Sequence, residues 1–360
     1  MPTYKYTLKN GKTMWYANFY YTDWTGEKKH ICKRGFKTQR EAKEYEHSFL
    51  DQQSKSSDIL FSNLVENYLN DMKYRLKPTT MENKRNIIEK KLLPYFSRLK
   101  TCDIDTIKIR TWQNELISFR DTDGKPYSQT YLKTIHNQMS AIMNYAMKHY
   151  GLLSNPCASA GSIGKSKAGE MKFWTQKQYE IFSKNIQKSA LKLAFDILFY
   201  SGIRSGELLA LTPSDILPDK RISIHKNFAK VNGQELFLVP KTPRSKRTIA
   251  IPEFLYDDIK NYIAKLYGIQ PTDRIFYFTK SALEKEIKRV AKKAGLPEIR
   301  VHDLRHSHAS MLIDMGFDIL EISERLGHES VKTTLDTYSH LYPDKDKRLA
   351  NELNKLRRPE

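Results

Sequence analysis

Two stretches of this chain break every regular spacing of apolar residues and divide the sequence into three parts. The first, DQQSKSSD at 51–58, is polar throughout. The second, SNPCASAGSIGKSKAG at 154–169, is rich in Ser, Gly and Ala and predicts a flexible interdomain linker. With 360 residues, 39% of them hydrophobic and 28% charged, the chain is long enough for two or three domains with cores of their own.

Residues 1–55 predict a small sheet followed by a helix. Alternate positions of one strand carry side chains that share a face: Trp15, Ala17, Phe19 and Tyr21. KKHICKRGF at 28–36 continues the strand pattern, and Thr38 followed by Glu41 has the spacing of a capping box at a helix start. We therefore expect two or three short strands and then one helix.

Residues 58–155 contain no good strand and predict a small helical bundle. Thr79 followed by Glu82 has the spacing of a second capping box, which places a helix start there. Gly151 is placed to end a longer helix. The apolar residues at helical spacing are Leu60, Leu64, Tyr68, Ile87, Ile88, Leu92, Leu132, Ile135, Met139, Ile142 and Ala146.

Helices dominate again from about residue 171. Within that region three short alternating runs, RISIHK, QELFLVP and RTIAIP, predict a small antiparallel sheet inserted among the helices. The expected fold class is therefore a multidomain, mainly α protein with small β-sheets.

The charge of the chain indicates a polyanionic partner. Lys and Arg number 61 against 41 Asp and Glu, which gives a net charge of +20 and a pI near 9.6. Phosphate contacts that release counterions make nucleic acid the leading candidate. The sequence has no recognisable secretory signal and no apolar run of membrane-spanning length, which predicts a cytoplasmic protein without a membrane partner. Three cysteines without paired spacing predict reduced packing residues: Cys32, Cys102 and Cys157.

The decapeptide VHDLRHSHAS at 301–310 is too polar for an ordinary core helix. His302 and His306 stand four apart and would share a helical face, which is also the spacing of a histidine pair that binds zinc. The first histidine is followed by Asp303 where the zinc motif has a glutamate, and Arg305 on the same face would repel a metal ion. A histidine and an arginine on one face suit an anion better, so we expect no metal.

Three further motifs accompany this decapeptide: LFYSGIRSGELLAL, VPKTPRSKRTIAIP and LGHESVKTTLDTYSH. Together the four motifs carry, in chain order, Arg204, Lys241, His302, Arg305, His328 and Tyr338. This ordered set resembles that of the tyrosine recombinase (phage integrase) family, and no catalytic position of the family is missing.

The resemblance implies a role for each of these side chains in the cleavage of a phosphodiester. Arg204 and Arg305 would form a bidentate clamp on the nonbridging phosphate oxygens. Glu207, three residues after the first arginine, would orient it. His302 would accept the proton of the nucleophile, and His328 would hydrogen-bond the phosphate.

The same resemblance makes Tyr338 the nucleophile, which would form a 3′-phosphotyrosine that keeps the bond energy for rejoining. Neither a metal nor another cofactor is implied. Lys241, on a mobile hairpin, would protonate the leaving 5′ oxygen. Lys246 and Arg247 lie in the same hairpin and remain alternatives to this lysine.

The other polar residues of the decapeptide are interpreted as structural. A helix cannot aim three histidines at one phosphate, so His306 and His308 are assigned to packing. Asp303 is expected to cap the helix or to form a salt bridge.

The resemblance covers most of the chain and implies four segments. These are an arm-type DNA-binding domain at 1–55, a helical core-binding domain at 58–155, a catalytic domain at 171–340 and a C-terminal tail at 341–360. The basic start resembles the arm-binding domains of integrases from temperate phages and conjugative transposons of Gram-positive bacteria. Its expected DNA contacts are Lys28, Lys29, Lys33, Arg34 and Lys37.

The implied function is site-specific integration and excision of a mobile element in the cytoplasm and nucleoid of a bacterial cell. The implied partners are double-stranded DNA attachment sites with core and arm sequences, an excisionase and a DNA-bending host factor. A homotetramer on DNA is also implied, and the tail offers an apolar stripe for a neighbouring protomer: Leu349, Leu353 and Leu356.

Three other functions remain as alternatives. A chromosome-dimer resolvase usually lacks an extra N-terminal domain. A type IB topoisomerase is disfavoured by the small helical domain and the tyrosine motif. A noncatalytic DNA-binding protein is disfavoured by the complete catalytic set.

Overall fold

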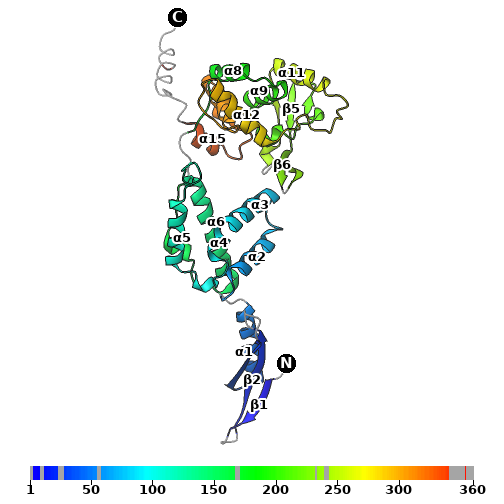
Figure 1. Cartoon of the computed structure of the whole chain (residues 1–360). Coiled ribbons are helices and arrows are strands. Elements are labelled where there is room, and N and C mark those ends of the chain that lie inside the picture. Colours follow the sequence, from blue (N-terminus) through cyan, green and yellow to red (C-terminus); the bar gives the residue numbers. More distant parts are fainter. Residues whose placement is uncertain are drawn as a thin grey trace. The chain divides into compact units, whose positions relative to one another are not determined.

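The computed structural model describes residues 3–8, 12–22, 28–54, 58–166, 171–231, 233–238, 243–339 and 353. The chain divides into two compact units, 1–168 and 169–360, which Figure 1 colours from blue to red along the sequence. None of the helices in the described ranges is long and apolar enough to cross a membrane.

Three antiparallel strands and a helix form the start of the chain (Figure 1): β1 (Thr3–Thr7), β2 (Thr13–Thr22), β3 (Lys28–Phe36) and α1 (Gln39–Ser54). Ala17 and Phe19 of the central strand are buried on the face that α1 covers. The Thr38 hydroxyl accepts the backbone N–H of Glu41 at 3.2 Å, and the Glu41 carboxylate accepts the N–H of Lys37 at 2.9 Å. The predicted order of strands and helix, and the helix start, are confirmed.

The rest of the first unit is helical and shares one core: α2 (Phe61–Met72), α3 (Pro78–Ile87), the π-helical turn η1 (Ile88–Leu92), α4 (Leu93–Phe96), the 3-10 turn η2 (Thr101–Asp103), α5 (Thr106–Ser118), α6 (Gln129–Tyr150) and α7 (Pro156–Ala160). Gly151 ends α6 in a left-handed conformation with φ 68°, as predicted. The capping box predicted at Thr79 and Glu82 is wrong. The helix begins instead at Pro78, because proline has no N–H to satisfy in a first turn.

The second predicted linker is a packed part of the helical unit as far as residue 166. Asn155 caps α7, since its side-chain oxygen accepts the N–H of Cys157 at 2.9 Å. Cys157 and Ala160 are buried in the helical core. The prediction of a flexible linker is therefore wrong for these residues, because small side chains suit close helix packing as well as linkers. Residues 167–170 lie outside the described ranges.

All three cysteines are free, but only one of them is a packing residue. Cys157 is buried, whereas Cys32 and Cys102 are exposed, which corrects the prediction for two of the three. The thiol of Cys102 donates to the carboxylate of Asp58 at 3.1 Å.

The second unit is mainly helical, with α8 (Gln176–Lys184), α9 (Ser189–Ser201), α10 (Ser205–Leu208), α11 (Glu253–Ala264), α12 (Lys280–Lys293), α13 (Asp303–Asp314), α14 (Ile319–Leu326) and α15 (Val331–Tyr338). Its strands are β4 (Ile216–Leu217), β5 (Arg221–Ile224), β6 (Asn227–Val231), β7 (Gln234–Leu238) and β8 (Arg247–Ala250). The single sheet predicted here is instead two. β4, β5 and β8 form one sheet, while β6 and β7 form a separate hairpin at whose turn Gly233 has φ 81°.

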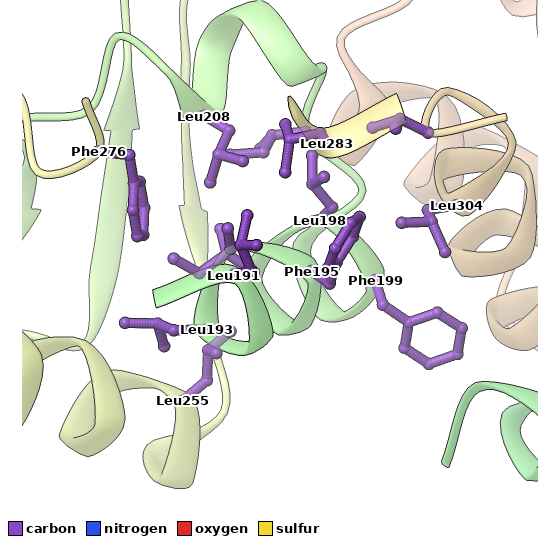
Figure 2. Close-up of a cluster of buried hydrophobic side chains, with 14 of the residues drawn as sticks. Leu191, Leu193, Phe195, Leu198, Phe199, Leu208, Leu255, Phe276, Leu283 and Leu304 are labelled. Atoms are coloured by element: carbon purple, nitrogen blue, oxygen red, sulfur yellow. The ribbon is translucent and has the colours of Figure 1, made fainter. Parts of the chain in front are cut away.

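α9 provides the central side chains of the second core, which Figure 2 shows as sticks. Leu191, Leu193, Phe195, Leu198 and Phe199 from this helix meet side chains from the surrounding elements: Leu208, Leu255, Phe276, Leu283 and Leu304. Each buried side chain of this size contributes about 1.5–3 kcal/mol to folding. This packing fixes the end of α9 against the start of α13, and both segments carry predicted site residues.

Candidate active site

Arg204 lies where α9 ends and α10 begins. The helix stops at Gly202, whose φ of 68° suits a left-handed helix end, and a Cβ at this glycine would lie 2.5 Å from the ring of His308. Arg204 Nη1 donates to Glu207 Oε1 at 2.8 Å, and the backbone N–H of Arg204 donates to Glu207 Oε2 at 2.9 Å. Glu207 is 3% exposed. A buried carboxylate therefore fixes the half-buried guanidinium group of Arg204.

Arg247 is a second partner of Glu207, and no motif or spacing in the sequence predicted this pairing. Arg247 Nη2 donates to Glu207 Oε2 at 3.0 Å, and its Nε donates to the carbonyl of Arg325 at 2.8 Å. Burial raises the pKa of Glu207, but Arg247 and Arg204 outweigh burial and hold this pKa below its usual value. The carboxylate is thus ionised and bridges two guanidinium groups.

Two of the three hairpin residues considered as the proton donor lie within the described part of the chain. Arg247 has a side chain that is only 7% exposed and is committed to the buried ion pair. Lys246 is exposed. Lys241 lies outside the described residues, in the segment 239–242 that follows β7.

Arg305 is held from α13 by two backbone carbonyl groups. Its Nη1 donates to the carbonyl of Gly202 at 2.8 Å and its Nη2 to that of Leu326 at 2.6 Å. Burial and the nearby charge of Arg204 lower the pKa of Arg305 to about 9, so the group is still a cation at neutral pH. These bonds engage two of the five guanidinium donors, which leaves others for a phosphate.

His328 comes directly after Gly327, the left-handed residue with φ 66° that caps the end of α14. Its Nδ1 lies 2.7 Å from the hydroxyl of buried Thr334. Burial, and then the positive charges of Arg305 and Arg204, lower the pKa of His328 to about 3. The structure therefore brings this histidine and both predicted clamp arginines together.

His302 occupies the residue before α13 and is exposed. Its ring is 5.3 Å, centroid to centroid, from the ring of His306 and nearly perpendicular to it. Desolvation, followed by the neighbouring His306 and Arg305, lowers the pKa of His302. The ring is therefore neutral at physiological pH, on the solvent side of the site.

Tyr338 is the last residue of α15 and is 1% exposed. Within the described residues, the hydrogen-bond partner of its hydroxyl is His306, whose Nδ1 lies 2.8 Å away. Burial raises the pKa of Tyr338 to about 12, and the charge of Arg305 acts against this rise. The contact with His306 was missed in the sequence, where this histidine was assigned to packing.

His308 and Asp303 have structural contacts. His308 Nδ1 lies 2.8 Å from the carbonyl of Phe199, and its Nε2 accepts from Arg325 Nε at 3.0 Å. The Asp303 carboxylate accepts both the backbone N–H and the guanidinium group of Arg300. These contacts hold α13 in place, and none of them involves the phenol of Tyr338.

The assembled site combines cationic guanidinium groups, neutral histidines and a buried phenol. Among the described residues, no three His, Cys, Asp or Glu side chains are grouped to hold a metal ion. Positive charge with many N–H donors suits a phosphate group, and a phenol is a side chain that can act as a nucleophile in phosphoryl transfer. The fold and the site together define the class of enzymes that cut and rejoin DNA through a tyrosine.

The N-terminal sheet separates the basic residues that the sequence assigned to DNA. Arg34 pairs with Tyr16 and lies on the open face, with its guanidinium carbon 5.7 Å from that ring centroid and 5.8 Å from that of Tyr6. Lys33 lies on the opposite face, where its Nζ is 4.5 Å from the ring of Tyr45 on α1. The strand register thus places the neighbouring cations Arg34 and Lys33 on opposite faces of the sheet, a difference that the sequence did not predict.

The other three basic residues follow from the same register. Lys29 is four residues before Lys33 in β3 and lies on the helix side with it. Lys37 comes directly after β3. The side chain of Lys28 lies outside the described part.

Comparisons with known proteins identify the family. Residues 172–345 match the phage integrase family, residues 3–53 an arm DNA-binding domain, and residues 60–117 a phage integrase N-terminal SAM-like domain. The chain is 33% identical to the ICEBs1 integrase of Bacillus subtilis, over 97% of this chain and 98% of that protein. It is 25% identical to a XerC-like tyrosine recombinase of Caldanaerobacter subterraneus, over 72% of this chain and 73% of that protein. The chain belongs to the phage integrase family of tyrosine recombinases and is an integrase, a site-specific DNA recombinase, as the ordered motifs predicted.

Solved structures share the fold. The Tn1549 transposon integrase in complex with transposon right-end DNA matches with a TM-score of 0.65 and 19% identity, over 81% of this chain and 99% of that chain. A lambda integrase dimer bound to a COC′ core site matches with a TM-score of 0.60 and 18% identity, over 96% of each chain. The mainly helical fold with small antiparallel sheets is confirmed.

Proposed function

We propose that this integrase cuts and rejoins DNA through a covalent 3′-phosphotyrosine on Tyr338. The observation that carries the proposal is the convergence of Arg204, Arg305 and His328 on one site, with Arg305 close enough to lower the pKa of the buried phenol. A phenol with a raised pKa attacks poorly unless positive charge and a proton acceptor stand next to it.

The side chains of the site then take separate roles. Arg204 and Arg305 bind the nonbridging oxygens, where charge develops in the transition state. Glu207 orients Arg204 through its two hydrogen bonds. His302, on the solvent side, is the proton acceptor that the sequence predicts, and His328 hydrogen-bonds the phosphate.

In the cleavage step, the oxygen of Tyr338 forms a bond to phosphorus as the bond from phosphorus to the 5′ oxygen breaks. The electron pair leaves on the 5′ oxygen, which takes a proton from Lys241. Rejoining is the reverse, with the 5′ hydroxyl as the attacking group. The guanidinium groups supply the positive charge at the phosphate, so the step requires no cofactor.

Replacement of the nucleophile tests this proposal. Tyr338→Phe should form no covalent adduct on a nicked suicide substrate, because the attacking oxygen is gone, but should bind the DNA as the unmodified chain does. Tyr267→Phe is the matched control, since this tyrosine is fully exposed and should react normally. Adduct yield is read by denaturing gel and peptide mapping. Cleavage by Tyr338→Phe, or an adduct that maps to Tyr342, would contradict the proposal.

We infer that segments 1–55, 58–155 and 171–340 act as arm-binding, core-binding and catalytic domains, followed by the tail at 341–360. The extents of the three family matches support this division. In the first segment, the open face of the sheet suits arm DNA because it presents a cation among aromatic rings: Arg34, Tyr6 and Tyr16. Of the other predicted contacts, Lys28 and Lys37 would contact phosphates at the margins of this face, whereas Lys29 and Lys33 lie on the helix side and would not.

We also infer that the enzyme assembles as a homotetramer on attachment-site DNA in the bacterial cytoplasm and nucleoid. An apolar groove of about 610 Å³ between α11, α13 and α14 supports this assembly, with Phe254, Met311, Met315 and Ile322 in its lining. The tail stripe of Leu349, Leu353 and Leu356 is the proposed occupant, from a neighbouring protomer. Of this stripe, Leu353 alone lies within the described residues, and it is exposed. An excisionase and a DNA-bending host factor would set the direction of the reaction.

A further inference from the structure

The contact between Tyr338 and His306 is not explained by the residues of the family motif. His306 follows Arg305 on α13 and belongs to none of the six motif positions. Its Nδ1 lies 2.8 Å from the Tyr338 hydroxyl, and the two rings are 5.7 Å apart at 58°. The tyrosine is 1% exposed, so this contact is made away from water.

We propose that His306 is the catalytic base that removes the proton of Tyr338 during DNA cleavage. The proposal rests on the proposed role of Tyr338 as nucleophile. It replaces His302 as the proton acceptor, because His306 is the histidine in hydrogen-bond contact with the attacking oxygen.

The charges around His306 keep a nitrogen available for this proton. Burial lowers the pKa of His306, Asp303 opposes this effect, and Arg305 and Arg300 lower the pKa further. The neutral ring of His302 adds no charge on its side. A neutral imidazole has one nitrogen that accepts and one that donates, so Nδ1 can accept the phenolic O–H while Nε2 carries the other hydrogen.

The proton balance of both steps is then complete. During cleavage, the bond between phosphorus and the Tyr338 oxygen forms and the phenolic proton moves to His306 Nδ1. The bond to the 5′ oxygen breaks, and that oxygen takes its proton from Lys241. During rejoining, the 5′ hydroxyl attacks phosphorus and returns its proton to Lys241, and the departing tyrosine oxygen takes its proton back from His306. The raised pKa of the phenol explains why a base in contact is needed, since the hydroxyl does not ionise by itself near neutral pH.

An asparagine at position 306 separates a base from a residue that only holds the tyrosine. The amide oxygen of asparagine occupies nearly the position of the histidine Nδ1 and accepts a hydrogen bond, but it takes up no proton. If the asparagine variant shows no thermal unfolding transition and is therefore not folded, His306→Gln, which has a polar group of similar reach, takes its place in the test. His302→Asn is the matched control on the neighbouring ring.

The test is single-turnover cleavage of a nicked suicide substrate by the full chain. His306→Asn should bind the DNA normally and cleave roughly 10²–10⁴-fold more slowly, the range of general base catalysis. A fluorinated tyrosine at position 338, whose phenol ionises near neutral pH, should restore most of this loss, because no base is then needed. The same fluorinated tyrosine should not restore the loss in His302→Asn.

Each other outcome overturns the assignment. Cleavage by His306→Asn at the unmodified rate, or a loss that fluorinated tyrosine does not restore, would mean that His306 only positions the phenol. Restoration of His302→Asn and not of His306→Asn would return the base to His302. An adduct of the unmodified chain at a residue other than Tyr338 would instead refute the proposed function itself, so the two failures are distinguishable.

Discussion

Replacement of Glu207 by glutamine is the sharpest test of how the site is held together. The change removes one negative charge and keeps the shape of the side chain. In the native chain this carboxylate lies 2.8 Å from Arg204 Nη1 and 3.0 Å from Arg247 Nη2. Without this charge, the cation of Arg247, whose side chain is 7% exposed, loses the ion-pair partner that it has among the described residues.

The expected loss follows from the burial of each pair. Removing one partner of a buried ion pair costs about 3–5 kcal/mol of unfolding free energy, and the pair of Glu207 with Arg247 is of this kind. Arg204 has a side chain that is 35% exposed, so solvent screens its pair and it adds at most about 1 kcal/mol. Because the glutamine oxygen still accepts hydrogen bonds, we expect a loss of unfolding free energy at the lower end of this range, about 3 kcal/mol.

Urea unfolding measures this difference directly. The double variant Glu207→Gln with Arg247→Met should be more stable than Glu207→Gln alone, since it has no unpaired buried cation. DNA cleavage should remain slow in both variants, because Arg204 loses its anchor. A loss below about 1 kcal/mol in the single variant, or no gain in the double variant, would refute the argument from burial.

The pH dependence gives an independent check. The pKa of Glu207 is lower in the folded chain than its ordinary value of 4.5, so its stabilising effect is present above pH 4.5 and is lost as the pH falls through the folded-state pKa. The glutamine variant has no such group. The stabilities of the two proteins should therefore converge in acid, and a difference that stays constant below pH 4.5 would contradict the lowered pKa.

Three further predictions concern other parts of the chain. Gly202→Ala should lose about 2–4 kcal/mol of unfolding free energy in urea and should cleave more slowly. The new Cβ would lie 2.5 Å from the His308 ring, and the Gly202 carbonyl accepts a hydrogen bond from Arg305. The control Gly295→Ala has a similar φ but open space around its Cβ, so it should lose only the ~1–2 kcal/mol of backbone strain. Arg34→Ala should weaken binding to arm DNA in a fluorescence titration and reduce its salt slope by about 1, and an equal effect of Lys33→Ala would contradict the assignment of faces. Truncation after Leu341 should abolish tetramers on DNA, measured by light scattering, but not binding of a single core site; tetramers of the truncated chain would refute the tail contact.

Local sequence rules were sufficient for much of the fold because the signals they use are short-range. The capping contact of Thr38 and the left-handed Gly151 each depend on residues within one helical turn. The rule failed at Thr79, where Pro78 starts the helix one residue earlier. The two sheets were predicted as one because strand pairing joins residues far apart, so that Arg221 pairs with Ala250 across the whole β6–β7 hairpin.

The segment mistaken for a linker shows a different limit. Asn155, Cys157 and Ala160 are small or polar residues that are typical of linkers, yet they pack in the helical core. Small side chains allow backbones to approach closely, and composition alone does not tell an exposed stretch from a tightly packed one. Only the contacts with the longer helices decide between the two.

In the site, too, contacts between residues close in the chain were predicted and some contacts between distant residues were not. The ordered motif predicted a site that joins Arg204, Arg305 and His328, which lie together in the structure. Glu207 was included in that prediction because it lies three residues from Arg204. Arg247 was considered only as an alternative acid, since its partner lies 40 residues earlier and nothing near it in the chain marks a buried ion pair. The ion pair explains why a cation in the hairpin is largely buried while its neighbour Lys246 is exposed.

The oversight of His306 has a specific physical cause. A helix cannot aim three histidines at one phosphate, and His308, which contacts Phe199 and Arg325, obeys that argument. The phosphate is not the only group that a histidine of α13 can contact, however, because the hydroxyl of Tyr338, 32 residues later in the chain, lies 2.8 Å from His306 Nδ1. The two neighbouring residues of α13 therefore have different partners. Arg305, with Arg204, stabilises the charge of the phosphate, and His306 accepts the proton of the phenol.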